Sequence, residues 1–209
     1  MTPIAGFSSG IYKDSIKYPH KQTFINQISS RYHTQQTLKP KSWDEDVHTS
    51  IVYDTYKTSH EYFDKSFIPL DLVDSIDKKL QQLIHQENLD LLGKFHISEM
   101  WYNAYTHGQY QYMHKHSNGN NNVFSGIYYL KFNSKEHTST RFYNPAFEID
   151  FDKVRYNKFF CFMPDVVEDD LIIFASDIGH DVPQQYSSEL RITVSFNVIC
   201  KYHESMQYT

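Results

Sequence analysis

The part of the chain that follows Gly93 consists of short segments rich in β-branched and aromatic residues, separated by polar loops. Such side chains favour strands because they pack well on a pleated surface, and the 17 Tyr and 15 Phe of the whole sequence strengthen this tendency. Several strands joined by loops, with one long helix ahead of them, predict a sandwich or a barrel. The segments predicted as strands are 95–105, 109–116, 124–132, 141–143, 170–175 and 191–200.

The long helix is predicted over about residues 69–92. Apolar residues recur there at helical spacing, with acidic residues early and lysines later, which suits the helix dipole. Gly93 is well placed to end the helix. Residues 1–66 are polar and weakly periodic, and they are interpreted as an arm with a few short elements. We therefore predict a mainly β chain with helices (α+β): an N-terminal extension over 1–94, packed on a core over 95–209, one structural domain overall.

Composition excludes several function classes. The 20 basic and 25 acidic residues give a net charge of −5, which argues against an extended nucleic-acid surface and against an anionic-membrane binder. The sequence has no apolar run long enough for a membrane span, and its first residues lack a secretory signal. Cys161 and Cys200 cannot form a disulfide framework and are typical of a reducing compartment. We expect a cytoplasmic monomer or homodimer.

Two histidines two residues apart are candidate metal ligands. His114 and His116 follow Gly108 by six and eight positions. On a strand, alternate side chains share one face, so both imidazoles can bind one ion. His180, at the end of a later apolar segment, is a third candidate, and three imidazoles suit Fe, Mn, Ni, Cu or Zn. The chain has 12 histidines, so any one of them alone is more often a surface or hydrogen-bonded core residue.

Arg191 opens the last predicted strand, where alternation places Arg191, Thr193 and Ser195 on one face. A buried arginine needs an anionic partner, and its planar fork suits a carboxylate. Taken alone, an exposed arginine paired with Glu189 is the commoner arrangement. Beside three candidate ligands, binding of a cosubstrate that carries a carboxylate becomes the better interpretation.

These residues belong to three motifs: Tyr105-x-x-Gly108-x5-His114-x-His116, Ser125-Gly126-Ile-Tyr-Tyr-Leu130, and His180-x10-Arg191-x-Thr193. Together the motifs resemble those of the iron(II)- and 2-oxoglutarate-dependent oxygenases, over roughly residues 97–199. The resemblance is strongest to a subgroup of largely uncharacterised bacterial and phage proteins with His-x-His in place of His-x-Asp. It implies a double-stranded β-helix core, also called a jelly roll and shared with cupins. It also implies a location in the cytoplasm, that of the host if the chain is phage-encoded.

The resemblance implies a dioxygenase that uses Fe(II), 2-oxoglutarate and O2, hydroxylates an unidentified substrate, and releases succinate and CO2. His114 and His180 would be iron ligands, and His116 stands where the carboxylate ligand of the family normally lies. That replacement removes one negative charge, which should strengthen attraction to the 2-oxoglutarate dianion. Alternatively, His116 lies outside the first shell, and a water or Asn118 completes the site.

For the cosubstrate, the resemblance implies that Arg191 binds the distal carboxylate of 2-oxoglutarate. Thr193 occupies the position of the usual serine. Tyr105 is a candidate for a hydrogen bond to the same cosubstrate.

Two other functions stay open. A cupin-like 3-His metal enzyme without 2-oxoglutarate shares the Gly-x5-His-x-His spacing, but Asn120 or Asn121 stands where its acidic residue is expected, and Arg191 is left unexplained. A jelly-roll binding or structural module with incidental histidines predicts no stoichiometric metal. The substrate is a protein side chain, a nucleobase or a small molecule. Trp43 in the arm over 1–66 could shape a substrate cleft, although a packing extension that closes one sheet is the simpler interpretation.

Overall fold

The computed structural model forms two antiparallel sheets with two α-helices among the residues that it describes. Those residues are 1–3, 10–34, 46–50, 67–116, 122–144 and 161–203. Their elements are β1 (Thr2–Pro3), β2 (Ile11–Ser15), α1 (Lys21–Thr34), β3 (His48–Thr49), α3 (Leu70–Gln86), the 3-10 turn η1 (Leu89–Leu91), β4 (Gly93–Tyr105), β5 (Gln111–His114), β6 (Asn122–Lys131), β7 (Arg141–Tyr143), β8 (Cys161–Phe162), β9 (Asp170–Ala175), β10 (His180–Val182) and β11 (Arg191–Tyr202).

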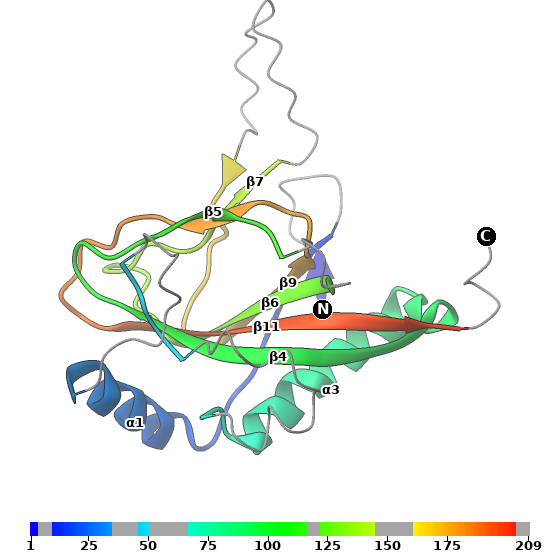
Figure 1. Cartoon of the computed structure of the whole chain (residues 1–209), viewed down its shortest axis with the longest axis horizontal. Coiled ribbons are helices and arrows are strands. Elements are labelled where there is room, and N and C mark those ends of the chain that lie inside the picture. The colour runs from blue at the N-terminus through cyan, green and yellow to red at the C-terminus, as the bar shows by residue number, and fades with distance from the viewer. Residues whose placement is uncertain (4–9, 35–45, 51–66, 117–121, 145–160, 204–209) are drawn as a thin grey trace, which may run out of the picture.

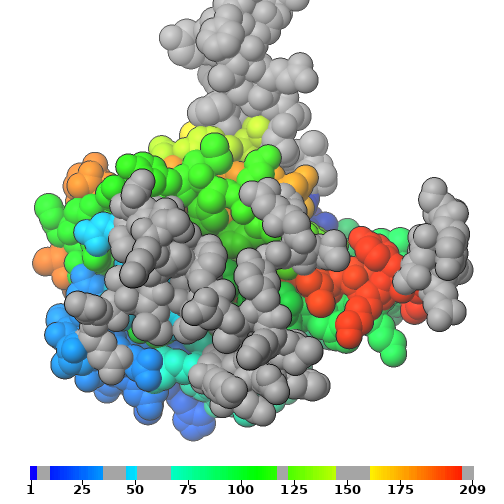
Figure 2. Space-filling model, in the orientation of Figure 1, coloured from blue at the N-terminus to red at the C-terminus, as the bar shows by residue number. Residues whose placement is uncertain are grey.

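The larger sheet has the strand order β1-β2-β9-β6-β11-β4-β3, and the smaller sheet has the order β5-β10-β7-β8. Figure 1 shows the smaller sheet above the larger one, with α1 and α3 against the opposite face of the larger sheet. In Figure 2, α1 (blue) lies at one side of the molecule and the end of β11 (red) at the other. Two facing antiparallel sheets are the arrangement expected for the predicted jelly roll.

Alternation along the strands supplies two separate apolar layers. On β9, Leu171 and Ile173 pack with the helices, while Ile172 and Phe174 face the smaller sheet. Helix α3 contributes five buried residues at helical spacing to the first layer: Leu72, Ile76, Leu80, Leu83 and Ile84. The second layer lies between the two sheets, and the candidate site described below is next to it.

The long helix ends earlier than predicted. It stops at Gln86 rather than near residue 92, because Asn88 adopts a left-handed conformation with φ 55°, and η1 follows. Gly93 therefore begins β4 and does not end the helix. Its role is close packing, since a Cβ there would lie 2.3 Å from the carbonyl oxygen of Lys201 on β11.

The N-terminal residues contain more regular structure than their sequence suggests. Helix α1 has 14 residues, but it buries only Phe24, Ile25 and Ile28, so its periodicity is weak. Strand β2 pairs with β9 at one side of the large sheet, and β3 pairs with β4 at the other. A boundary near residue 94 stays a prediction. Among the described residues, no helix has the length and hydropathy needed to cross a membrane.

Candidate metal centre

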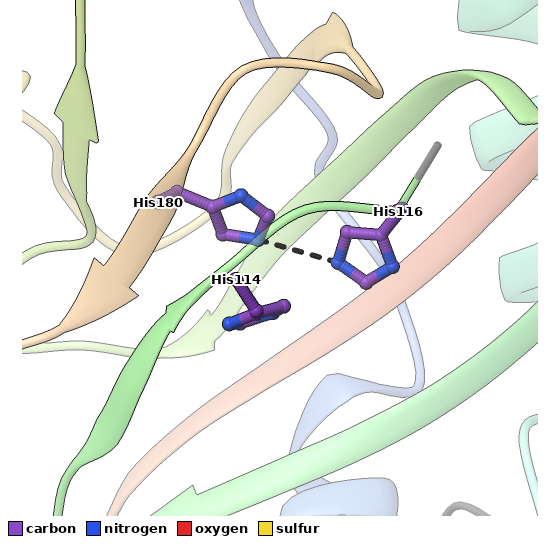
Figure 3. Close-up of side chains that lie close together, drawn as sticks. All are labelled: His114, His116 and His180. Carbon is purple, nitrogen blue, oxygen red and sulfur yellow. Dashed lines mark hydrogen bonds between the residues drawn. The ribbon is translucent and has the colours of Figure 1, made fainter. Parts of the chain in front are cut away.

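The three predicted histidines meet between the two sheets. His114 ends β5, His116 lies two residues further on, and His180 begins β10 (Figure 3). Their candidate ligand nitrogens all lie within 4.8 Å of one another, and the Nε2 atoms of His116 and His180 are 3.3 Å apart. Nitrogens that share one ion at bonds of about 2.1 Å are roughly 3.0–3.4 Å apart. Small side-chain movements are therefore enough to bind a single divalent ion.

A β-bulge directs β5 into the site. His114 pairs with His180, whereas Gln111 pairs with Val182, so three steps along β5 face two steps along β10. A bulge of this kind turns side chains that simple alternation would separate toward the same face. As a result, both Gln111 and His114 line the cavity.

His116 lies beyond the end of β5, so strand alternation alone does not explain its orientation. Its backbone N–H donates to the carbonyl oxygen of Ser176 at 2.9 Å, which ties this part of the chain to the end of β9. The His116 ring packs beside Trp101, with ring centroids 5.9 Å apart. His114 and His116 therefore lie together as the sequence predicts, but the contact with Ser176, rather than strand alternation, brings His116 there.

Two of the imidazoles are held in the tautomer that binds metal. Nδ1 of His114 lies 2.8 Å from the carbonyl oxygen of Tyr112, and Nδ1 of His180 lies 3.1 Å from that of Ile178. A carbonyl oxygen only accepts, so each Nδ1 carries the proton and donates it. Nε2 of each ring keeps its lone pair, and a backbone partner of this kind orients a ligand histidine.

Burial keeps the imidazoles of His116 and His180 neutral. Burial, and then the neighbouring His114, lowers the pKa of His116 to about 3. Burial also lowers the pKa of His180 well below its ordinary value, with His114 and His116 acting in the same direction. Neutral imidazole is the form that binds metal, so the site is ready for an ion at neutral pH.

The cavity around the histidines contains no acidic side chain among the described residues that line it. A divalent ion held there by three neutral imidazoles keeps both of its positive charges. Besides the histidines, the lining consists of Trp101, Asn103, Tyr105, Gln111, Ser125, Gly126, Ile127, Thr140, Phe174, Val182, Thr193, Ser195 and Phe196.

Arg191 is fully buried beside this cavity, with a relative exposure of 0%. Its Nη2 donates to Oγ1 of Thr140 at 3.3 Å, and its guanidinium lies 5.0 Å from the ring centre of Tyr105. Nε and Nη1 are buried and have no hydrogen-bond partner among the described residues. Glu189, the alternative partner considered from sequence, is exposed. Burial lowers the pKa of the Arg191 guanidinium, yet arginine stays charged in proteins, so its buried charge calls for an anion.

Thr193 and Tyr105 lie at the Arg191 end of the cavity. Both line it, and Tyr105 is the cross-strand partner of Arg191 in the β4–β11 pair. The Tyr105 hydroxyl donates to Oε1 of Gln111 at 3.0 Å. These positions fit the cosubstrate contacts that the resemblance implies.

Three residues of the site carry no signal in the sequence: Thr140, Gln111 and Ser176. Thr140 lies in a loop, Gln111 reaches the site through the bulge, and Ser176 acts through its backbone carbonyl, so no residue pattern marks them. Four residues considered from sequence lie outside the described part of the chain: Trp43, Asn118, Asn120 and Asn121.

Comparisons with known proteins agree with this geometry. Residues 99–197, a little under half of the chain, match the family described as putative 2OG-Fe(II) oxygenase. No curated protein matches the sequence.

Several solved structures share the fold. A Pseudomonas putida prolyl-4-hydroxylase has a TM-score of 0.61 at 13% identity, covering 93% of this chain and 94% of that one. A Trichoplax adhaerens prolyl hydroxylase, in complex with a hypoxia inducible factor peptide fragment, has a TM-score of 0.57 at 13% identity, covering 92% and 84%. HygX from Streptomyces hygroscopicus, with nickel and 2-oxoglutarate bound, has a TM-score of 0.58 at 11% identity, covering 93% and 84%.

At these identities the structural likeness concerns the fold alone, and it confirms the predicted double-stranded β-helix. The family match covers the strands that carry all three motifs. Residues 99–197 are therefore similar to the putative 2OG-Fe(II) oxygenase family, and the chain has the fold of solved enzymes of that class.

Proposed function

We propose that this protein is an Fe(II)- and 2-oxoglutarate-dependent dioxygenase that hydroxylates its substrate and releases succinate and CO2. One observation carries the proposal. The fully buried Arg191, with two guanidinium nitrogens that have no hydrogen-bond partner among the described residues, lies beside a cavity with three converging imidazoles and no acidic side chain in its described lining. A cupin-like enzyme that needs no 2-oxoglutarate gives Arg191 no function.

The histidines would hold Fe(II) through Nε2 of His114 and His180, with His116 as the third ligand. The iron, once bound with 2-oxoglutarate, supplies the activation of O2. Arg191 would donate from its unpaired guanidinium nitrogens to the distal carboxylate, an anion that a guanidinium is suited to bind. Thr193 and Tyr105 would add hydrogen bonds to the same cosubstrate from the wall of the cavity.

The charge of the metal ligands distinguishes this site from a His-x-Asp site. Three neutral ligands leave the ion with two positive charges, and Arg191 adds a third nearby. A dianionic cosubstrate is attracted to both ends of such a cavity, and the buried surroundings reduce the screening of that attraction by water. His116 therefore favours cosubstrate binding.

Three classes of substrate are candidates. Among proteins with this fold, one solved structure holds a hypoxia inducible factor peptide and another holds hygromycin B. We keep a protein side chain, a nucleobase and a small molecule as candidate substrates, for a monomeric or homodimeric enzyme of the cytoplasm. Two free cysteines, Cys161 and Cys200, are consistent with a reducing compartment.

The test is metal analysis followed by an assay of succinate formed from 2-oxoglutarate without added substrate. We expect about one iron per chain and slow succinate formation that depends on both iron and O2. His180→Ala, which removes a ligand buried to 4% exposure, should abolish both. Stoichiometric metal without binding or turnover of 2-oxoglutarate would instead support the cupin-like function, and no metal at all would support a structural module.

A further inference from the structure

We infer that Asn122 and Ser176 position His116 as the third ligand of the metal site. The inference rests on the proposed function, because it assigns a support to one of the proposed ligands. It also gives a role to Ser125 of the Ser125-Gly126 motif, which the proposed chemistry leaves unused.

His116 needs such a support because it stands outside every strand. His114 and His180 belong to paired strands, and their own Nδ1–H groups donate to nearby backbone carbonyls. His116 is held through its backbone at both ends of the residue. Its N–H donates to the Ser176 carbonyl oxygen at 2.9 Å, and its carbonyl oxygen accepts from Nδ2 of Asn122 at 3.1 Å.

The two residues that hold His116 are themselves fixed by adjacent strands. Asn122 begins β6, and Ser176 directly follows β9, the neighbour of β6 in the large sheet. The Ser176 N–H donates to the carbonyl oxygen of Val123 at 3.1 Å, which links the two ends directly. The sheet therefore fixes the position of His116 although the residue is not part of it.

A chain of buried hydrogen bonds fixes the Ser176 side chain as well. Oγ of Ser125 donates to Oδ1 of Asn197 at 2.9 Å, and Nδ2 of Asn197 donates to Oε2 of Glu99 at 2.8 Å. A hydroxyl has only one proton, so in the 2.9 Å contact between Ser176 Oγ and Ser125 Oγ the donor must be Ser176. The chain thus runs in one direction, from Ser176 to the Glu99 carboxylate, and each bond polarises the next.

This arrangement matters because metal coordination tolerates little positional error. Ligand distances must lie within about 0.2 Å of their preferred values. Two backbone hydrogen bonds on His116 restrict where its ring can reach, so losing one should weaken the metal site more than the fold. Loss of the partners that orient ligands typically lowers metal affinity about 10- to 100-fold.

The experiment compares Co(II) affinity, measured anaerobically by chelator competition, among wild type, Asn122→Ala, His116→Ala and the double variant. We expect Asn122→Ala to weaken Co(II) binding about tenfold and to shift the visible Co(II) spectrum toward that of His116→Ala. In the His116→Ala background, Asn122→Ala should have no further effect, because Asn122 acts only through His116. Asn26→Ala is the matched control, since Asn26 is an exposed asparagine whose Oδ1 accepts a hydrogen bond from Gln22 on the same helix, α1.

A second variant tests the inference independently if Asn122→Ala fails to fold. Ser125→Ala removes the acceptor of the Ser176 proton and should weaken Co(II) binding in the same direction, with circular dichroism unchanged. The inference is overturned if Asn122→Ala and Ser125→Ala both bind Co(II) with wild-type affinity. It is also overturned if Asn122→Ala lowers Co(II) affinity equally in the wild-type and His116→Ala backgrounds. A wild-type chain that binds no Co(II) overturns the proposed function itself, and the inference with it.

Discussion

Replacement of Arg191 by methionine separates cosubstrate binding from metal binding. Methionine fills much of the same buried space but carries no charge and no donor. Arg191 contacts none of the three histidines through a hydrogen bond, and its side-chain bond goes to Thr140. We therefore expect Arg191→Met to keep metal affinity close to that of wild type while 2-oxoglutarate binding falls sharply.

The expected loss of 2-oxoglutarate affinity follows from the unpaired guanidinium nitrogens of Arg191. Two buried nitrogens, Nε and Nη1, have no acceptor among the described residues, and hydrogen bonds to a charged partner contribute about 1.5–3 kcal/mol each. Truncating one partner of a buried charged pair costs roughly 2–5 kcal/mol, which corresponds to about a 30- to 5,000-fold rise in Kd. Without cosubstrate the same change removes an uncompensated buried charge, so the variant should be no less stable than wild type beyond the loss of ring contacts with Tyr105 and Tyr129.

The assay is anaerobic calorimetry of metal-loaded protein with 2-oxoglutarate and, separately, with pyruvate, which lacks the distal carboxylate. Wild type should prefer 2-oxoglutarate strongly, and Arg191→Met should lose that preference while its affinity for pyruvate changes little. If the variant retains the wild-type Kd for 2-oxoglutarate, or if wild type binds pyruvate equally well, Arg191 does not bind the distal carboxylate.

Three further predictions concern His116 and the fold. His116→Asp should keep the metal but weaken 2-oxoglutarate binding in the same titration. The added carboxylate repels the dianion, and one unit charge at roughly 5 Å and an effective dielectric of about 20 contributes about 3 kcal/mol. An unchanged or lower Kd for 2-oxoglutarate would contradict this expectation. The metal-free protein should lose stability to urea as pH falls from about 6.5 toward 3. His116 has a folded pKa of about 3, so over that range it binds its proton only in the unfolded chain. If stability does not change with pH in either wild type or His116→Gln, His116 is not held neutral in the folded protein. Gly126→Ala should destabilise the fold by about 1–3 kcal/mol in urea unfolding, since its Cβ would lie 2.0 Å from the Phe196 ring; an unaffected midpoint would show that the ring moves freely.

The large sheet was predictable from sequence because its central strands are long and apolar on both faces. Predicted segment 170–175 coincides with β9, and β4, β6 and β11 differ from their predictions only at the ends. In the smaller sheet, predicted segment 141–143 coincides with β7. Helix α1 was missed because only three of its residues are buried, and tertiary packing rather than periodicity stabilises it. The three residues of β10 are too few to form a recognisable strand pattern.

The candidate ligands were also visible in the sequence, but the reasons for their placement were not. A spacing of two residues suggested alternation on one strand, whereas the structure uses a bulge before His114 and backbone contacts at His116. Such contacts involve backbone atoms of Ser176 and a side chain on β6, and neither leaves a residue pattern near the histidines. The lack of a counter-anion for Arg191 among the described residues could be recognised only after folding.

The most direct test of the assigned function is anaerobic addition of 2-oxoglutarate to the Fe(II)-loaded chain, followed by visible absorption. We predict a metal-to-ligand charge-transfer band that saturates at one cosubstrate per iron and is absent in His180→Ala. Iron-loaded wild-type protein that shows no such band at saturating 2-oxoglutarate would contradict the central claim.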